Sequence, residues 1–365
     1  MIFSCDKATL LNGINIASKA LPQKSINPIC DGILFYARNS EVILTTTDAS
    51  LTIQTKIAAD IKEEGSVVIN GKFIGEVIRK MPDGMVKISG DKNGIEVTGN
   101  FSKINISALD PDDYPALPVI DKDSFFTLEQ GELKKLITQT MFATSMDDAR
   151  PIFTGCLFDI EEESINVVAL DGHRLALRNS FVQDIDEPIK AIIPARALSE
   201  ITKIISDTED LARLYIQKSY CMVEIEETKI ITRLIDGDFI KYRPLIPTEF
   251  KTTLTINRVD LLEAIDRAWL IVRENLRNKY IVFRITDEKL IITSRSDSGK
   301  AYEEVDYAGS ATPIEIGFNP QYFVDCLKNI EDEFINFSYT TEKGPTVTAP
   351  VDGNKFLYLL LPVIL

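Results

Sequence analysis

The same pattern of apolar and polar positions occurs three times along this chain. Phe3–Ile14 reads FSCDKATLLNGI, Phe126–Ile137 reads FTLEQGELKKLI, and Leu254–Ile265 reads LTINRVDLLEAI. In each copy a short alternating stretch, typical of a strand, passes into apolar residues three and four apart, which is typical of a helix. The copies start 123 and 128 residues apart. A period of that length is a whole domain, so the pattern predicts three tandem, related domains.

A second shared segment lies further along each copy. It covers Ile69–Ile78, Ile193–Thr202 and Phe318–Leu327, at offsets of 124 and 125 residues. Between the shared segments lie paired runs rich in Val, Ile and Thr, which predict antiparallel strands. The pairs are Gly32–Phe35 with Val42–Thr46, Gly155–Phe158 with Ile165–Ala169, and Tyr280–Phe283 with Leu290–Ser294. Each domain is therefore predicted to be α+β, with two helices packed on antiparallel sheets.

Capping residues and prolines mark the ends of these elements. Asp6 and Asn257 stand where an N-cap would begin the first helix of a copy, and Glu129 is a weaker candidate at the matching position. Two proline-bearing stretches, Leu109–Asp123 and Arg243–Lys251, are unsuited to a helix interior or a central strand. They place the domain boundaries near residues 121 and 250, which gives domains 1–121, 122–250 and 251–365.

Composition favours a protein of the cytoplasm. The 365 residues are 45% hydrophobic, which is enough for three sizeable cores. No apolar stretch is long enough to span a bilayer, and the N-terminus MIFSCDKATLL lacks the charged and apolar regions of a signal peptide. The five cysteines are odd in number, scattered and without a CxxC pair, so free thiols in a reducing cytoplasm are expected.

Charge is distributed unevenly along the chain. The net charge is −15, which by itself argues against a nucleic-acid ligand. The helical segments of the three copies together carry +4, however, so that the remaining residues carry −19. This contrast fits helices that face a polyanion, and it also fits the general preference of helices for Lys and Arg.

The sequence lacks the motifs of catalysis, metal binding and cofactor binding. The chain has one histidine, His173, and no HExxH, GxGxxG, Walker or GxSxG motif. The acidic pairs Asp112-Asp113 and Asp147-Asp148 consist of neighbours, and neighbouring side chains on a strand point to opposite faces. We therefore expect a binding protein without a cofactor or a catalytic metal, rather than an enzyme.

One turn differs between the copies. Asp171–Leu175 reads DGHRL and follows a predicted strand, where the other copies have Asp48–Ser50 and Ser296–Ser298. Three interpretations are open. Asp171 and His173 could form an acid–base pair, or Asp171 could cap a tight turn in which glycine supplies a positive φ. A turn altered in a single copy could also mark a binding surface, since loops on a rigid scaffold often carry function.

The string LDGHRLALR, Leu170–Arg178, resembles the TDGHRLA signature of the bacterial DNA polymerase III beta subunit, the sliding clamp. The resemblance covers the whole chain, because it includes the length, the triplication, the acidic charge and the apolar C-terminus. Further matching segments are Leu234–Phe239, Tyr242–Pro247, Gly317–Asn319 with Tyr322, and Ala143–Ser145 with Arg150 and Pro151.

The resemblance implies the DNA clamp fold and a head-to-tail homodimer. Two chains of three domains would form a closed ring, with sheets around the outside and helices lining the hole. The ring would encircle double-stranded DNA without reading its sequence and confer processivity on a replicative polymerase. The polymerase, the clamp loader and other replication and repair proteins would dock through short linear motifs.

The resemblance also implies a pocket for those motifs between the second and third domains. The matching residues are mostly apolar, as a groove that buries Leu or Phe anchors requires. They are Phe153, Gly155, Leu170, Gly172, His173, Arg174, Leu175, Ile240, Pro244, Leu245, Asn319, Tyr322, Leu359, Leu360, Leu361, Pro362, Val363, Ile364 and Leu365. Among them, Leu175, Leu245 and Leu360 could equally be plain core residues.

Two more sets of residues follow from the same matching. The residues expected to contact DNA are Lys24 and Arg150 on loops, and Lys72, Arg79, Lys80, Arg196 and Lys203 on helices. Each of these could also be an ordinary solvated side chain. The residues expected at the dimer interface are Ile104 of the first domain, facing Leu270, Ile271 and Leu276 of the third.

Two positions depart from the family pattern. Leu170 stands where the family has Thr, and Ile364 stands where it has a basic residue. Both make the pocket more apolar, so an altered motif preference is expected. The alternative functions are a clamp-like paralogue with a specialised partner set and a hydrolase built on Asp171 and His173. Replacing His173 by Ala would abolish turnover by the hydrolase but would only weaken partner binding by a clamp.

Overall fold

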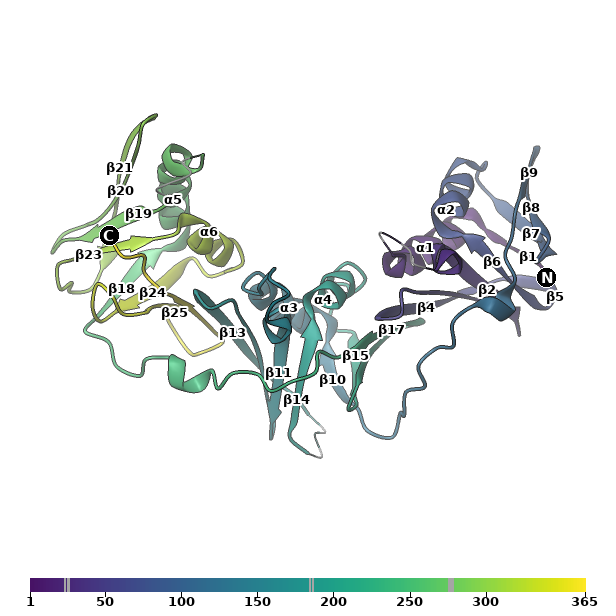
Figure 1. Ribbon diagram of the computed structural model, residues 1–365, viewed down its shortest axis with the longest axis horizontal. Coiled ribbons are helices and arrows are strands. Elements are labelled where there is room, and N and C mark those ends of the chain that lie inside the picture. The colour runs from purple at the N-terminus through teal and green to yellow at the C-terminus, as the bar shows by residue number, and fades with distance from the viewer. Residues whose placement is uncertain (23, 25–26, 184, 186, 275–278) are drawn as a thin grey trace. The chain divides into compact units, whose positions relative to one another are not determined.

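The computed structural model describes residues 1–22, 24, 27–183, 185, 187–274 and 279–365. Its contacts divide the chain into two compact units, whose elements are labelled in Figure 1. Unit 1 consists of Met1–Gly131 and Arg196–Leu234, and unit 2 consists of Glu132–Ala195 and Ile235–Leu365. The second repeat therefore contributes to both units.

The first repeat contains the helices α1 (Lys7–Ala17) and α2 (Gly71–Lys80). Its strands are β1 (Ile2–Asp6), β2 (Gly32–Arg38), β3 (Glu41–Thr47), β4 (Leu51–Ala58), β5 (Asp60–Glu63), β6 (Gly65–Asn70), β7 (Met85–Asp91), β8 (Gly94–Gly99) and β9 (Ser102–Ile106). Short 3₁₀ turns are η1 (Ser18–Ala20), η2 (Pro28–Asp31) and, in the proline-bearing stretch that follows, η3 (Pro111–Asp113).

The second repeat contains α3 (Gln130–Met141) and α4 (Ala195–Thr202). Its strands are β10 (Phe126–Glu129), β11 (Gly155–Glu161), β12 (Ser164–Leu170), β13 (Arg174–Phe181), β14 (Ile189–Pro194), β15 (Leu211–Ile216), β16 (Tyr220–Ile225) and β17 (Thr228–Arg233). The 3₁₀ turn η4 (Pro151–Phe153) precedes β11, and η5 (Arg243–Leu245) lies in the stretch that leads to the third repeat.

The third repeat contains α5 (Arg258–Val272) and α6 (Pro320–Lys328). Its strands are β18 (Thr252–Asn257), β19 (Ile281–Ile285), β20 (Leu290–Ser296), β21 (Gly299–Val305), β22 (Tyr307–Ala308), β23 (Ile314–Phe318), β24 (Phe334–Tyr339), β25 (Thr346–Pro350) and β26 (Phe356–Leu360). All three repeats thus share one order of strand, helix, strands, helix and three strands. The predicted triplication and the α+β class are confirmed, while the boundaries near residues 121 and 250 stay predictions.

The sheets of unit 1 join strands of two repeats. One sheet has five strands of the first repeat, in the order β5-β1-β7-β8-β9. The other has eight strands, in the order β10-β15-β16-β17-β4-β3-β2-β6. At its centre β17 pairs antiparallel with β4, from Thr228 opposite Thr55 to Thr232 opposite Leu51. This contact, called junction 1 below, makes one continuous sheet from two repeats.

The sheets of unit 2 repeat that arrangement. A nine-stranded sheet has the order β14-β11-β12-β13-β26-β25-β24-β18-β22, and a second sheet has the order β21-β20-β19-β23. In the larger sheet β13 pairs with β26, from Arg174 opposite Leu360 to Arg178 opposite Phe356. This contact is called junction 2. It joins the second repeat to the third in the way that junction 1 joins the first to the second.

Apolar side chains of the alternating strands form the cores. In unit 1, Phe3, Phe35 and Leu44 from three strands pack with Leu10 and Ile14 of α1, and all five are at most 1% exposed. The helices α1 and α2 lie side by side against this core (Figure 1).

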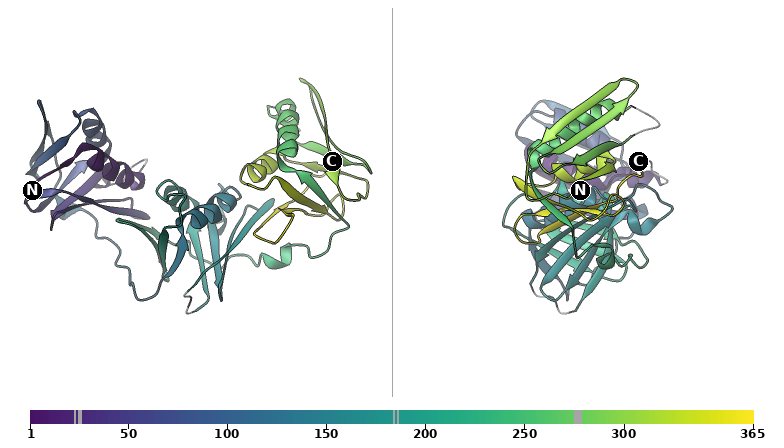
Figure 2. Two further views of the ribbon diagram at one scale, coloured as in Figure 1. Left: turned by 180° about the vertical axis from the view of Figure 1, so that it is seen from behind. Right: turned by 90° about the vertical axis from the view of Figure 1, so that its left-hand side faces the viewer.

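In unit 2 the third repeat is centred on aromatic rings. Phe283, Phe318 and Phe323 lie with ring centroids 4.9–5.1 Å apart, and Phe337 completes the cluster. Phe323 belongs to α6, and α6 packs against α5 (Figure 2).

The predicted caps are confirmed at two of three positions. The Asp6 carboxylate accepts hydrogen bonds from the amides of Ala8 and Thr9. The Asn257 side chain accepts from Val259 and Asp260.

At the start of α3 the Glu129 cap stays a prediction. There the amides of Gln130 and Gly131 donate to the backbone carbonyls of Asp210 and Thr208, at 2.8 and 2.9 Å. Backbone acceptors from the loop after α4 thus satisfy the first two amides of this helix.

All five cysteines are free and buried, as expected from their spacing. Burial raises the pKa of Cys5, Cys156 and Cys221 to about 12. Such thiols stay protonated and unreactive at neutral pH. None of the described helices has the length and apolarity that crossing a bilayer requires.

Removing the Asn257 cap tests the start of α5. We expect Asn257→Ala to lower the free energy of unfolding by about 1 kcal/mol, because two first-turn amides lose their acceptor. Hydrogen exchange of the amides of Val259 and Asp260 reports the effect locally. Asn257→Ser is the matched control, since serine keeps an acceptor. Equal exchange rates in the two variants would contradict the capping role.

Candidate functional site

Junction 1 is closed at both ends by backbone hydrogen bonds that extend the strand ladder. At one end the amide of Lys56 donates to the carbonyl of Glu227 at 3.1 Å. At the other end the amide of Arg233 donates to the carbonyl of Ser50 at 2.9 Å. In between, the hydroxyls of Thr55 and Thr228 lie 2.8 Å apart across the junction.

Junction 2 has the same two closing bonds at equivalent positions. The amide of Asn179 donates to the carbonyl of Lys355 at 3.0 Å, and the amide of Leu361 donates to that of His173 at 2.9 Å. The repeat offsets make Asn179 the counterpart of Lys56 and make His173 the counterpart of Ser50. The two junctions therefore have one geometry.

The turn that precedes β13 has the predicted tight structure. Asp171 Oδ1 accepts the amides of His173 and Arg174 at 2.9 and 3.1 Å, and Gly172 has φ = 96°. Asp171 Oδ2 accepts the Nε of Arg174 at 2.9 Å. Both carboxylate oxygens are thus engaged by other donors, and the His173 ring instead stacks on Tyr322, with centroids 6.2 Å apart. This arrangement favours a structural turn over an acid–base pair.

Arg174 connects this turn to two helices. Its Nη1 donates to Asp325 of α6 at 2.6 Å, and its Nη2 donates to the carbonyl of Phe142, just after α3, at 2.7 Å. The guanidinium also lies 4.6 Å from the centre of the Tyr322 ring. With its side chain only 10% exposed, Arg174 uses its donors within the protein. We conclude that it positions the turn and is not free to bind a ligand.

An apolar cluster lies beside the turn and contains part of the predicted pocket. Phe153, Leu170, Leu175 and Leu359 are all buried in it. The cluster also contains Val347, with Ala349 packed against it, from β25. Sequence reasoning missed these two, because they look like ordinary alternating strand residues.

The C-terminal tail that follows β26 is exposed and apolar. Leu361 and Val363 are 41% and 38% exposed, Leu365 is 57% exposed, and Ile364 is 86% exposed. The tail is attached to β23, since the amide of Val363 donates to the carbonyl of Gly317 at 2.8 Å. A Cβ at Gly317 would lie 2.5 Å from a methyl of Leu365 and 3.1 Å from the carbonyl oxygen of Val363, so a larger residue there would require the tail to shift.

A buried carboxylate holds the Ile240–Leu245 segment, whose neighbours Phe239 and Ile246 pack against the apolar cluster. Ile240 and Leu245, which are 42% and 45% exposed, flank Tyr242, which is buried. The Tyr242 hydroxyl donates to Asp159 Oδ2 at 2.7 Å, and Arg243 donates to the same oxygen at 3.3 Å. Burial, followed by the hydrogen bond to Asp159, raises the pKa of Tyr242. These contacts fix the segment to β11.

Other residues of the predicted pocket have structural roles. A Cβ at Gly155 would lie 2.4 Å from the carbonyl oxygen of Ile193. Leu360 is 3% exposed and pairs in junction 2. Asn319 caps α6 by accepting the amide of Gln321. Pro244 is exposed in η5, and Pro362 is half-buried.

The predicted DNA-contacting residues fall into two groups. Lys72, Arg79 and Lys80 are exposed on α2, Arg150 lies 6.0 Å from the Phe153 ring centre, and Lys24 is exposed. The two residues associated with α4, Lys203 and Arg196, form ion pairs, with Glu200 at 2.8 Å and with Asp48.

The carboxylate of Asp48 occupies in junction 1 the place that Asp171 occupies in junction 2. It is 6% exposed and accepts the amides of Ser50 and Leu51 at 3.0 and 2.8 Å. Burial opposes its ionisation, but these hydrogen bonds and the charge of Arg196 outweigh burial and lower the pKa of the carboxyl. Asp48 is thus charged at neutral pH.

The predicted interface residues lie on two separate elements. Ile104 is half-buried on β9. Leu270, 67% exposed, and Ile271, half-buried, lie on α5. Leu276 lies outside the described residues.

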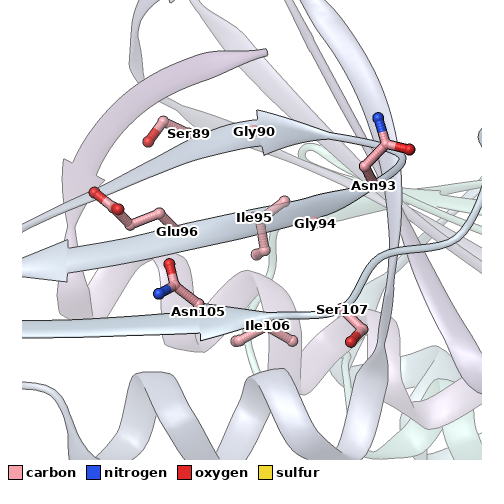
Figure 3. A pocket seen from close by; sticks show the side chains of 9 residues that line it. All are labelled: Ser89, Gly90, Asn93, Gly94, Ile95, Glu96, Asn105, Ile106 and Ser107. Carbon is pink, nitrogen blue, oxygen red and sulfur yellow. The ribbon is translucent and has the colours of Figure 1, made fainter.

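A hollow of about 520 Å³ lies on the five-stranded sheet next to β9 (Figure 3). Ser89, Glu96 and Asn105 stand opposite one another across β7, β8 and β9. Gly90 and Gly94, at the hairpin end, contribute no side chains. The hollow contains none of the residues of the predicted peptide pocket.

Comparison with known proteins covers the whole chain. Family models of the N-terminal, central and C-terminal domains of DNA polymerase III beta subunits match residues 1–118, 127–241 and 243–364. A beta sliding clamp of Staphylococcus epidermidis is 33% identical, over all of this chain and 99% of its own. One from Halalkalibacterium halodurans is 30% identical with the same coverage.

Solved structures give the same result. A putative DNA polymerase III beta subunit from Eubacterium rectale is 35% identical, with a TM-score of 0.96 and full coverage of both chains. A DNA polymerase sliding clamp from Bacillus subtilis is 30% identical, with a TM-score of 0.96 and coverage of 100% of this chain and 99% of its own.

Removing Arg174 tests its positioning role. We expect Arg174→Ala to lower the free energy of unfolding by about 3 kcal/mol, because two carboxylates and a carbonyl lose a buried donor. Urea denaturation measures this effect. Lys203→Ala, which removes an exposed ion pair, is the control and should change stability by less than about 0.5 kcal/mol. A loss in Arg174→Ala no larger than in the control would contradict the role.

Proposed function

The chain belongs to the family of bacterial DNA polymerase III beta subunits, the sliding clamps, and we propose that two copies form a closed ring around double-stranded DNA. In that ring the protein acts without catalysis, as a moving attachment point for a replicative polymerase. The observation that carries the proposal is a pair of edge strands, β9 and β21, which correspond to paired strands elsewhere in the chain.

The two junctions follow one rule. In each junction, the third strand after the first helix of one repeat pairs with the final strand of the next repeat. Thus β4 pairs with β17, and β13 pairs with β26. By the same rule, β21 of the third repeat requires the final strand of another first repeat, which is β9. Both are edge strands in the described structure. In a head-to-tail pair, β9 of each chain would pair with β21 of the other chain, and these two contacts would close the assembly.

The internal junctions also determine the register of this contact, called the seam below. Leu51 opposes Thr232 and Arg174 opposes Leu360. The repeat offsets make Gly299 the counterpart of Leu51 and Arg174. The final strands β9 and β17 each begin directly after a hairpin turn, at Ser102 and Thr228. Counting from these two residues makes Ile106 the counterpart of Thr232. Gly299 of one chain should therefore oppose Ile106 of the other.

Burial within the single chain supports this register. It places Ala301 opposite Ile104, and both are half-buried in their own sheets. It places Tyr302 opposite Lys103, and both are exposed. A shift by one residue would put inward-facing side chains opposite outward-facing ones.

Exposed apolar residues support the same seam. Phe73 on α2 is 49% exposed, whereas its counterparts are covered: Ala197 is 2% exposed and Tyr322 stacks on His173. In the seam, α2 of one chain faces α5 of the other. Phe73 would then be covered by the turn before β21, with Leu270 nearby.

Non-specific contact with DNA is supported by the charge distribution. Lys72, Arg79 and Lys80 are exposed on α2, and the helical segments carry +4 within a chain of −15. Scattered cations attract phosphates without reading bases. The acidic remainder would repel DNA from other surfaces.

We propose that partner motifs dock at the apolar cluster between β13, β25, β26 and the Ile240–Leu245 segment. It offers buried Leu170 and Leu175 as a floor and exposed Leu361 and Ile364 as a rim. Such a groove suits a short peptide with Leu or Phe anchors. The polymerase and the clamp loader are the partners we propose for it.

Cross-linking tests the ring. We expect Lys103→Cys/Tyr302→Cys to oxidise to a species of twice the chain mass, because the seam places these two outward-facing positions opposite each other. If assembled around a nicked circular duplex before oxidation, the covalent ring should stay on the circle in 1 M salt and leave once the DNA is linearised. Gel filtration after each step measures retention.

Lys103→Cys/Lys300→Cys is the matched control, since it is out of register by two residues on the same face. Equal cross-linking of the two variants would contradict the register. Retention of the covalent ring on linear DNA with free ends would contradict encirclement.

Peptide titration tests the pocket. We expect a peptide with Gln, Leu and Phe anchors to bind the wild-type protein, and Ile364→Arg to favour acidic flanking residues over apolar ones by about three- to tenfold. Fluorescence polarisation with matched acidic and apolar peptides measures this preference. Val259→Arg on α5 is the control for added charge. Absence of binding to the wild type, or an unchanged preference in Ile364→Arg, would contradict the assignment.

A further inference from the structure

The stretch that joins the second repeat to the third, called the connector below, is tied to the rest of unit 2 by backbone hydrogen bonds at its two ends. The amide of Ile235 donates to the carbonyl of Ile192 at 2.9 Å, and the amide of Lys251 donates to that of Tyr339 at 3.2 Å. Within the part of the chain that the structure describes, the backbone bonds between these two points are internal to the turn η5. Side chains must therefore set the position of the middle of the connector.

Asp159 on β11 is the acceptor for two side chains of the connector. It is 1% exposed, and its Oδ2 accepts the Tyr242 hydroxyl at 2.7 Å and the Arg243 guanidinium at 3.3 Å. Lys190 on β14 lies 3.3 Å from Oδ1 of the same carboxylate. Two cations thus compensate a buried charge that would be costly on its own. The hydroxyl of the buried tyrosine gains a charged acceptor, which makes a stronger hydrogen bond than a neutral one.

The stretch between the first and second repeats provides an internal comparison. The strands that follow the two stretches start 128 residues apart, which makes Tyr114 the counterpart of Tyr242. The Tyr114 hydroxyl donates to the backbone carbonyls of Gly32 and Thr45, at 3.4 and 3.2 Å. At the position equivalent to the aspartate stands Tyr36, which is exposed. Of these two buried or half-buried connector tyrosines, the one with a short bond to a carboxylate is therefore the one beside the apolar cluster.

The neighbours of Tyr242 in the connector contact that cluster. Phe239 and Ile246 pack against it, and the Phe239 ring lies edge-on to Phe153 with the centroids 6.2 Å apart. Tyr242 is itself a buried member of the cluster. The hydrogen bond that holds Tyr242 thus also holds the wall that the connector contributes to the cluster.

From these contacts we propose that Asp159 and Tyr242 are positioning residues for partner motifs. Their hydrogen bond keeps the connector where it forms one wall of the motif-binding cluster. The inference rests on the proposed docking of motifs at that cluster. When the bond is lost, the connector spends part of its time away from β11, and the apparent affinity for a motif falls with the fraction that is still in place. Neither side chain needs to touch the motif for this effect.

Removing the Tyr242 hydroxyl tests the inference in the full-length protein. We expect Tyr242→Phe to weaken binding of the peptide with Gln, Leu and Phe anchors about three- to tenfold, because a hydrogen bond to a charged acceptor is lost while the ring remains. Asp159→Ala should weaken binding by a similar factor, and the double variant should bind no more weakly than Asp159→Ala alone. Asp159→Asn, which keeps an acceptor oxygen, should retain most of the wild-type affinity. Fluorescence polarisation measures each Kd.

Tyr114→Phe is the matched control. It removes the equivalent hydroxyl from the other connecting stretch, in unit 1, so the Kd of the peptide should stay within about twofold of the wild-type value. Hydrogen exchange of the amides of Leu245 and Ile246 gives a second measurement that does not need the peptide. It should be faster in Tyr242→Phe and unchanged in Tyr114→Phe.

Three results would overturn the inference. They are an unchanged affinity in Tyr242→Phe, equal weakening in Tyr114→Phe, and additive losses in the double variant. Failure of the docking proposal gives a different result, because the wild-type protein would then not bind the peptide, and the inference would fall with it. Binding by the wild type without an effect of Tyr242→Phe would leave the pocket in place and remove only the positioning role.

Discussion

The architecture depends on one constraint, which is that the backbone groups of edge strands need partners. Junctions 1 and 2 meet it in the same way, with an antiparallel ladder closed by one extra amide-to-carbonyl bond at each end. An unpaired edge attracts another strand. A chain of three related repeats can satisfy this constraint internally only twice. The equivalent third contact, between β9 and β21, is the one that we propose two copies make, and in that ring triplication and self-assembly would have a common physical cause.

Much of the fold could be predicted from the sequence, because its signals are local. The strand alternation, the helical spacing and the caps at Asp6 and Asn257 are set by neighbouring residues. The joining of β4 to β17 and of β13 to β26 could not be predicted, since alternation shows which face of a strand is buried but not which strand lies beside it. The backbone acceptors at the start of α3 could not be predicted for a similar reason, because they come from the distant Thr208 and Asp210.

The candidate site was less predictable than the fold. Resemblance identified Leu170, Leu175 and Leu359, which the structure brings into one apolar cluster. It also grouped Arg174 with them, although that side chain is committed to Asp171 and Asp325. Neither the Tyr242–Asp159 hydrogen bond nor the place of Val347 has a sequence signal. Each depends on contacts between segments far apart in the chain, which is where sequence patterns are least informative.

Sliding along DNA requires attraction that is weak and independent of sequence. In the proposed ring, the acidic protein would meet this requirement because part of its positive charge is committed internally. Arg196 pairs with Asp48, and Lys203 pairs with Glu200. Lys72, Arg79 and Lys80 remain exposed on α2. Because an ion pair reduces the charge that a phosphate experiences, Arg196 and Lys203 would add less attraction to the proposed DNA contact than exposed, unpaired cations. An uneven, modest field of this kind favours a ring that is retained by its topology over one that is retained by affinity.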